Sequence, residues 1–152
     1  MPLHVVLIEP EIPTNTGNIG RLCLATGSQL HLVRPLGFEI DDSRLKRAGL
    51  DYWQHLDVHT YDNAHSFFET HKDKAMAFFS SHATNIYLSL DFEQDLYLIF
   101  GKESVGLAKE ILEEEKDRLY KIPLFSDQIR SLNLANAVAV IVYEGLRQLQ
   151  GP

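Results

Sequence analysis

The residues best suited to chemistry lie in three segments, each of which includes or follows a short apolar run. The first segment, EPEIPTNTGNIGRLCLA at 9–25, contains Asn15 and Arg21. Its proline, glycine and asparagine residues are typical of a tight loop, and free backbone N–H groups at the start of the following helix can bind an anion. A turn followed by a helix cap, with Arg21 in solvent, is the alternative interpretation of the same residues.

The second segment, LYLIFGKESVGL at 96–107, places Gly101 at the end of a buried strand and Glu103 just beyond it. A glycine at that position allows a ligand to approach the backbone closely. A plain link from strand to helix, with Glu103 favouring the helix N-terminus, would have the same pattern.

The third segment, IPLFSDQIRSLNLAN at 122–136, joins a short strand to the last helix. Ser131 is a natural N-cap, and Asn133 and Asn136 are one turn apart and share a helix face. Asparagine is a weak helix former, so two of them early in a helix favour a functional role.

Short apolar runs alternate with amphipathic stretches along the chain, which predicts an α/β fold with a mostly parallel sheet flanked by helices. Ligands bind at the carboxyl ends of strands in such sheets, and the three segments lie there. We expect strands at 3–8, 30–33, 54–61, 75–79, 96–100 and 120–123, and helices at 18–25, 41–48, 62–71, 107–116 and 131–149.

The composition limits the class of protein. The 152 residues, 45% of them hydrophobic, suit a single domain over 1–152. One cysteine, Cys23, excludes an intramolecular disulfide and a cysteine-based zinc cluster, and the seven histidines match no metal motif, so we expect no metal. No apolar run reaches the ~18 residues of a membrane span. We therefore expect a soluble, cytoplasmic domain with no membrane partner.

The net charge of −7 on its own argues against a nucleic-acid partner. The excess is local, because residues 61–117 hold 12 acidic and 5 basic residues, whereas 118–152 hold 2 acidic and 4 basic residues. A few cations, such as Arg21, Lys46 and Arg130, can still form a local RNA-binding surface.

A cationic stretch, DDSRLKR at 41–47, precedes Tyr52 and Trp53. The cations are typical of a solvated helix surface, with phosphate contact as the alternative. The two aromatic side chains favour a core role, with stacking on a base as the alternative.

Taken together, the segments resemble the SPOUT superfamily of S-adenosylmethionine-dependent RNA methyltransferases, and within it the TrmL/YibK-like tRNA (cytidine/uridine-34)-2′-O-methyltransferases. The similarity covers nearly the whole chain, and its motifs occur in the family's order. They are IEPEIPTNTGNIGRLCLATG at 8–27, KRAGLDYW at 46–53, FGKESVGL at 100–107 and SLNLANAVAVIVYEGLRQL at 131–149.

The resemblance implies a C-terminal trefoil knot, an exception to the rule that chains are unknotted. It also implies that S-adenosylmethionine binds against the knot and is converted to S-adenosylhomocysteine. By the family's pattern the cofactor contacts fall at Phe79, Gly101, Ile122, Ser131, Leu132 and Asn136. The loop at 125–129 differs in length from the family's pattern.

The resemblance further implies methyl transfer to the ribose 2′-hydroxyl of the wobble nucleotide of tRNA, with Asn15, Arg21, Glu103 and Asn133 as catalytic residues. The Arg21 guanidinium stays protonated, so we expect it to orient the hydroxyl and to hold an adjacent phosphate. Asn15 could fix the Arg21 side chain. Glu103 and Asn133 could hold ribose or cofactor groups.

The family works as a homodimer in which each site takes residues from both subunits, and the apolar C-terminal helix, with Val138, Val142 and Tyr143, is a candidate for part of that interface. Three alternatives remain open from the sequence. They are 2′-O-methylation of ribosomal RNA or of another tRNA position, RNA binding without catalysis, and a different nucleotide-binding module such as a flavodoxin-like one.

Overall fold

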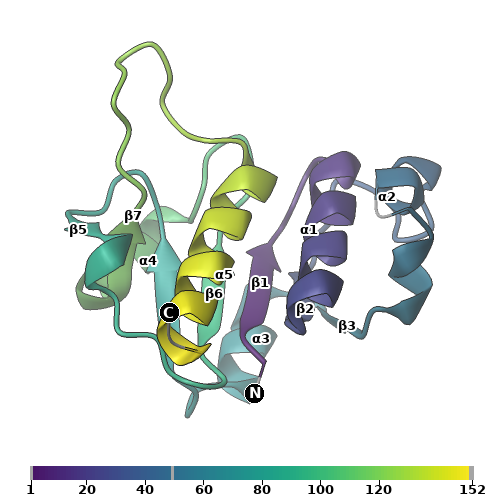
Figure 1. Cartoon of the computed structure of the whole chain (residues 1–152), viewed down its shortest axis with the longest axis horizontal. Helices are drawn as coiled ribbons and strands as arrows, with labels where there is room; N and C mark the ends of the chain where they lie inside the picture. Colours follow the sequence, from purple (N-terminus) through teal and green to yellow (C-terminus); the bar gives the residue numbers. More distant parts are fainter. Residues whose placement is uncertain (1, 49, 151–152) are drawn as a thin grey trace.

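A single twisted sheet of parallel strands organises the molecule (Figure 1). The computed structural model describes residues 2–48 and 50–150. The strand order is β3-β2-β1-β6-β4-β7-β5, and every pairing between these strands is parallel, which confirms the predicted α/β class. The strands are β1 His4–Ile8, β2 Gln29–Val33, β3 Val58–Tyr61, β4 Met76–Phe79, β5 Asn85–Ile86, β6 Tyr97–Phe100 and β7 Leu119–Lys121.

Helices cover both faces of this sheet, with α1 and α5 side by side on one face and α3 on the other (Figure 1). Among the described residues, every helix is too short or too polar to cross a membrane. The α-helices are α1 Pro13–Thr26, α2 Ser43–Ala48, α3 Ala64–Thr70, α4 Lys109–Glu114 and α5 Leu134–Gln150, and three 3₁₀ turns are η1 Leu50–His55, η2 Tyr87–Ser89 and η3 Lys116–Arg118.

The apolar runs of the central strands arise because both faces of the sheet are buried. In β1, Val5 and Leu7 pack with Val138 and Ile141 of α5, while the alternate residue Val6 joins the cluster on the α3 face. Successive side chains of a strand point to opposite faces, so one apolar run supplies two cores.

The first helix differs from its prediction. Residues 13–17 were expected to form a tight loop, but α1 already begins at Pro13; it ends at Thr26, and Gly27, with φ 67°, is its C-cap. Proline suits the first turn of a helix because its missing N–H is not needed there. The left-handed backbone lies earlier, at Glu9 with φ 54°.

Two other predictions of local structure were wrong at their boundaries. Residues 54–57 are not strand, because η1 runs to His55 and β3 begins at Val58. Ser131 is not the N-cap of the last helix, which begins at Leu134. The cap is Asn133, whose Oδ1 accepts hydrogen bonds from the backbone N–H groups of Ala135 (2.9 Å) and Asn136 (3.3 Å).

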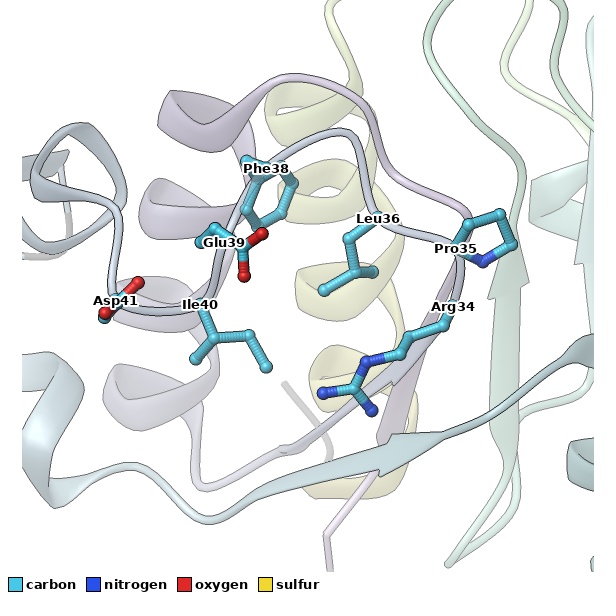
Figure 2. Close-up of a pocket in the computed structure, with 7 residues that line it drawn as sticks. All are labelled: Arg34, Pro35, Leu36, Phe38, Glu39, Ile40 and Asp41. Atoms are coloured by element: carbon cyan, nitrogen blue, oxygen red, sulfur yellow. The ribbon is translucent and has the colours of Figure 1, made fainter.

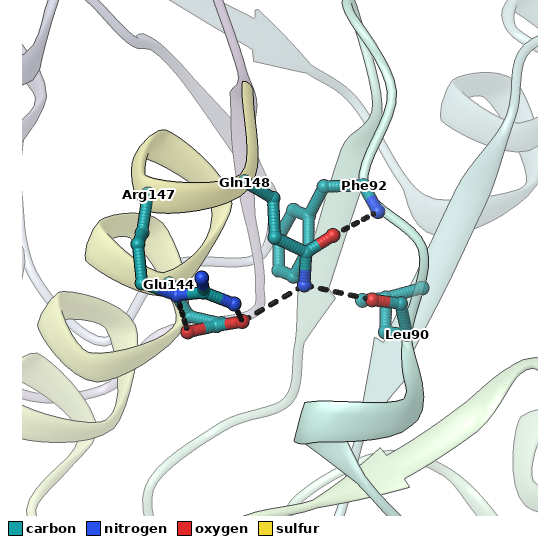
Figure 3. A network of polar contacts seen from close by, with 5 residues as sticks. All are labelled: Leu90, Phe92, Glu144, Arg147 and Gln148. Atoms are coloured by element: carbon teal, nitrogen blue, oxygen red, sulfur yellow. Dashed lines mark hydrogen bonds and ion pairs between the residues drawn. The ribbon is translucent and has the colours of Figure 1, made fainter. Parts of the chain in front are cut away.

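The C-terminal end of α5 is fixed to the loop before β6 (Figure 3). Gln148 donates to the backbone carbonyl of Leu90 and to Glu144, and its side-chain oxygen accepts the N–H of Phe92 at 3.0 Å. Arg147 also donates to Glu144, and these bonds lower the pKa of that carboxyl to about 2. With this end anchored, the N-terminal end of α5 is held at the carboxyl edge of the sheet.

Candidate active site

Two carboxylates lock the loop after β1 to the loop after β6. The Glu103 carboxylate accepts hydrogen bonds from the backbone N–H groups of Glu11 (2.7 Å) and Ile12 (3.0 Å). In return the Glu11 carboxylate accepts the N–H (2.8 Å) and the hydroxyl (3.0 Å) of Ser104, which lowers the pKa of Glu11. These loops are neighbours because β1 and β6 pair in parallel.

The Glu103 carboxylate lies next to the N-terminus of α1. An anion was expected at the free N–H groups of the helix start; the N–H groups just before α1, those of Glu11 and Ile12, are instead bound by the chain's own Glu103 carboxylate. A carboxylate at a helix N-terminus is stabilised by the helix dipole and by charge-assisted hydrogen bonds. Glu103 therefore joins β6 to α1 across 91 positions of sequence.

A third segment is attached to the same carboxylate through Asn15. The Asn15 side-chain N–H₂ donates to Glu103 at 3.2 Å, and its oxygen accepts from the Asn133 side chain at 3.1 Å. Asn15 is buried, so both of its polar ends need such partners. Glu103, Asn15 and Asn133 thus form one chain of hydrogen bonds, called here the Glu103 network, which joins three of the predicted catalytic residues.

A cavity of about 820 Å³ opens beside the Glu103 network, at the carboxyl ends of β4, β6 and β7. This volume lies within the range of cofactor pockets, and the position is the one expected for a parallel sheet. Eight of the predicted site residues line it: Asn15, Phe79, Gly101, Glu103, Ile122, Ser131, Leu132 and Asn133.

Arg21 and Asn136 are the two predicted site residues that are not part of the cavity lining. Six helical positions separate Asn15 from Arg21, which places them about 9 Å apart along α1 and about 120° apart around it. The Arg21 side chain is exposed, and its Cζ lies 5.4 Å from the centre of the Tyr52 ring. The expectation that Asn15 fixes Arg21 was wrong, because Asn15 bonds to Glu103 and Asn133.

Gly101 leaves space for another part of the chain. A Cβ built on this residue would lie 2.1 Å from the backbone carbon of Gly106 and 2.3 Å from the nitrogen of Leu107. The predicted close approach at Gly101 is therefore made by the loop that returns after Glu103, with Gly106 at φ 73°. Any side chain at this position would push that loop out of place and distort the cavity wall.

Several cavity residues were not predicted. Ser80 and His82 follow β4 directly, Tyr120 lies in β7, and Leu124 and Leu134 lie on either side of the loop that precedes α5. Ser80 could have been found from the rule that ligands meet the residues just after a strand. Leu134 carried no such signal, because its place depends on where α5 begins.

Cations gather at the rim of the cavity although the whole chain is acidic. Lys102, Lys121 and Arg130 line it together with a single carboxylate, that of Glu103. Lys102 pairs with Glu9 at 2.9 Å, which raises the pKa of Lys102. Arg130 lies on the exposed loop that extends away from the sheet between β7 and α5 (Figure 1).

A second cavity, of about 530 Å³, lies at the loop between β2 and α2. Figure 2 shows its side chains, which all come from residues 34–41 of that one loop. None of the predicted site residues lines it. In the described part of the chain, no group of three or more histidine, cysteine or acidic side chains is placed to hold a metal ion.

The model of the SpoU rRNA Methylase family matches residues 2–143. The chain belongs to this family. A SpoU relative from Geobacillus stearothermophilus is 48% identical over 151 residues, covering 97% of this chain and 96% of its own, and is named as a candidate tRNA (cytidine(34)-2′-O)-methyltransferase. The tRNA (cytidine(34)-2′-O)-methyltransferase of Saccharophagus degradans is 46% identical, with 96% and 95% covered.

A solved structure gives the same result for the fold. The structure described as "Structural insights into the 2-OH methylation of C/U34 on tRNA" superposes with a TM-score of 0.93 at 46% identity, covering 99% of this chain and 97% of the other. The family expected from the sequence is thereby confirmed. The trefoil knot stays a prediction, since strand order and pairing do not trace how the chain crosses itself.

Proposed function

We propose that this protein transfers a methyl group from S-adenosylmethionine to the ribose 2′-hydroxyl of nucleotide 34 of tRNA, with cytidine or uridine as the base. The observation that carries this proposal is the full-length similarity to proteins named for that reaction, at 46–48% identity. The cavity beside the Glu103 network gives the proposal a physical site.

The cavity suits a nucleoside cofactor. Its apolar walls include Phe79, Ile122 and Leu132, which can enclose an adenine ring. Polar groups at one side, from Ser131 and Asn133, can meet ribose or carboxylate oxygens. When bound, S-adenosylmethionine supplies a methyl group on a positively charged sulfur, which is already a strong electrophile.

Arg21 would act on the acceptor hydroxyl. Its guanidinium keeps its proton, so it donates hydrogen bonds to the 2′-oxygen and to a neighbouring phosphate, and its charge stabilises negative charge that develops on that oxygen. The proton of the hydroxyl would pass to that phosphate or to water as the methyl group is transferred. Positioning of the hydroxyl in line with the transferred group then supplies a large part of the rate.

The Glu103 network would hold the site in shape. The Glu103 carboxylate already accepts three hydrogen bonds, two from backbone and one from Asn15. These three bonds hold the residues before α1 and the Asn15 side chain in place. We therefore assign Glu103 and Asn15 to positioning of the cavity wall, and Asn133 to its junction with α5.

A homodimer would bring Arg21 to a cavity. On one chain Arg21 is exposed and does not line the cavity, so we propose that each cavity works with the Arg21 of the partner subunit. Exposed apolar side chains on α5, Val140 at 36% and Tyr143 at 55% exposure, provide a surface for such an association. The buried Val138 and Val142 pack in the core instead, so they support α5 rather than the contact.

The cations at the cavity rim suit tRNA phosphates, and binding through a few of them would be salt-sensitive. Such a substrate also favours a cytoplasmic location. Methylation of ribosomal RNA or of a different tRNA position is the second candidate, since the matched family is described by its rRNA methylases.

The experiment is methylation of bulk tRNA and, in a separate reaction, of ribosomal RNA with methyl-labelled S-adenosylmethionine, followed by mapping of the modified nucleotide. We expect label at the 2′-oxygen of nucleotide 34 and no label in ribosomal RNA. Label at another tRNA position, or only in ribosomal RNA, would contradict the assignment of the substrate. Binding of cofactor without any transfer would support the non-catalytic alternative.

A further inference from the structure

The Arg21 guanidinium lies over an aromatic ring. Its Cζ is 5.4 Å from the centre of Tyr52, a distance at which a cation is attracted by the negative face of the ring. Both side chains are exposed, Tyr52 at 45%. Tyr52 lies outside the cavity lining, and from the sequence alone only a core role or stacking on a base was proposed for it.

An aromatic ring holds an arginine differently from a carboxylate. A paired carboxylate would take up two N–H donors at the edge of the guanidinium and would cancel its charge. The face of a ring takes up neither, so the five N–H donors remain free for an oxygen ligand. Arginine has a long, flexible side chain, and a fixed ring beneath it removes part of the conformational freedom that would be lost on binding.

The backbone that carries Tyr52 is held in place by the neighbouring residue. Trp53 is half-buried and packs against α1, where Gly20 leaves space for it. A Cβ on Gly20 would lie 2.5 Å from Cζ3 of Trp53 and 3.0 Å from Leu56. The absence of a side chain at Gly20 thus lets η1 dock one position away from Arg21, and this docking places Tyr52 beneath the guanidinium.

We infer that Tyr52 is a positioning residue for Arg21, holding the guanidinium with its donor edge free so that it meets the 2′-oxygen and the adjacent phosphate of the RNA. This inference rests on the proposed methyl transfer. Tyr52 acts through Arg21 and makes no contact with the cofactor. Its contribution is to the rate of transfer rather than to the affinity for tRNA.

The test compares Tyr52→Leu, which removes the ring, with Tyr52→Phe, which keeps it. For Tyr52→Leu we expect kcat to fall about fivefold to tenfold, with the KM for tRNA, the Kd for S-adenosylmethionine and the Tm unchanged. For Tyr52→Phe we expect a kcat close to that of the wild type. Gln54→Leu, an exposed change in the same 3₁₀ turn, is the matched control and keeps full activity.

Three outcomes would overturn the inference. They are a wild-type kcat for Tyr52→Leu, an equal loss in Tyr52→Phe, or a raised KM for tRNA with kcat retained, which would make Tyr52 an RNA-stacking residue. A second route uses Gly20→Ala, which displaces Trp53 and should lower kcat in the same way.

A readout without substrate separates this inference from the proposed function. In the ring current of Tyr52, the NMR signal of the Arg21 Nε–H is expected upfield of its position in Tyr52→Leu. If that shift is seen but the wild type methylates no tRNA, the proposed function fails while the geometry stands. If methylation occurs and the shift is absent, the positioning role fails alone.

Discussion

The cavity and the Arg21 surface are two halves of the proposed site, and the chain builds them in different ways. The cavity wall draws on residues far apart in sequence, joined by the Glu103 network across as many as 118 positions. Arg21 instead lies on the exposed side of α1 and rests on the ring of one nearby residue, Tyr52. The first half is preorganised within one chain, whereas the second is open and requires RNA or a second subunit to complete it.

The two halves should therefore fail separately, and the largest effect should come from Arg21. In Arg21→Ala we expect kcat to fall by about 100-fold or more, because a donor to the reacting oxygen is lost. Cofactor affinity should stay unchanged, because Arg21 does not line the cavity. Turnover with labelled cofactor and calorimetric titration measure the two quantities.

Arg118→Ala is the matched control for this change, since its guanidinium also lies 5.4 Å from a ring, that of Phe78, but on the other face of the sheet. It should keep full turnover. An Arg21→Ala variant that retained wild-type turnover would remove Arg21 from the mechanism, and one that lost cofactor binding would show that the two halves are not separate.

A substitution in the cavity wall should affect cofactor binding and leave the Arg21 surface intact. In Leu132→Arg a long charged side chain replaces an apolar wall residue, so we expect cofactor affinity to fall about tenfold or more, since a charge buried without a partner is costly. Binding of tRNA, measured by filter retention, should persist. Phe125→Arg, in the same loop at 96% exposure, is the control and should bind cofactor normally.

A smaller effect should reach both halves at once. In Glu103→Gln the new side-chain N–H₂ group cannot accept a backbone N–H, so at least one charge-assisted bond is lost, at about 2 kcal/mol of folding free energy. Thermal unfolding should show a Tm lower by about 4–8 °C, with both cofactor affinity and turnover reduced. Glu110→Gln on the surface of α4 is the control. An unchanged Tm for Glu103→Gln would show that the Glu103 network does not contribute to the stability of the fold.

Changes on the opposite face of the sheet should have the smallest effect on the cavity and on the Arg21 surface. There His4, His31, Tyr61 and His71 form a continuous line of hydrogen bonds of 2.8–3.0 Å. Burial lowers the pKa of His31 to about 3, with His4, His59 and His71 adding to the shift, and it also lowers the pKa values of His4 and His71. Asp95, beside His4, partly opposes the shift of His4.

When burial lowers the pKa of an imidazole in the folded protein, the unfolded chain takes up a proton at a higher pH than the folded protein does. The folded protein therefore loses stability as the pH falls below the pKa that the imidazole has in the unfolded chain. His31 alone should therefore cost about 2 kcal/mol between pH 7 and pH 5. Thermal unfolding across this range should show a falling Tm that is flatter in His31→Gln, while the cofactor affinity of the folded protein changes little. A Tm that does not change with pH would contradict the claim that these histidines are neutral in the folded protein.

Much of the fold was predictable because the sheet is buried on both faces, so its central strands appear as plain apolar runs such as Leu96–Phe100. The boundaries that failed depended on contacts distant in sequence. Ser131 and Asn133 are both good caps, and α5 begins after Asn133, whose side chain also contacts Asn15. The family resemblance identified residues of the cavity wall, but their hydrogen-bond partners emerged only where the loop after β1 meets the loop after β6.

The Arg21 half was less predictable. Tyr52 and Trp53 are adjacent aromatic residues, and the sequence favours a core role for both. Only the space at Gly20 decides that Trp53 packs inward and that Tyr52 stays at the surface. The core role thus holds for Trp53, whereas Tyr52 lies at the surface beneath the Arg21 guanidinium.

Mixed dimers test the central claim most directly, namely that a cavity works with Arg21 of the partner subunit. Arg21→Ala chains and Leu132→Arg chains are co-expressed with different tags, and the doubly tagged dimer is assayed for methylation of nucleotide 34 at a cofactor concentration well below the Kd of the Leu132→Arg variant, where each parent alone is strongly impaired. We predict that activity returns, because one site combines an intact cavity with an intact Arg21. A mixed dimer as inactive as its two parents would contradict the account.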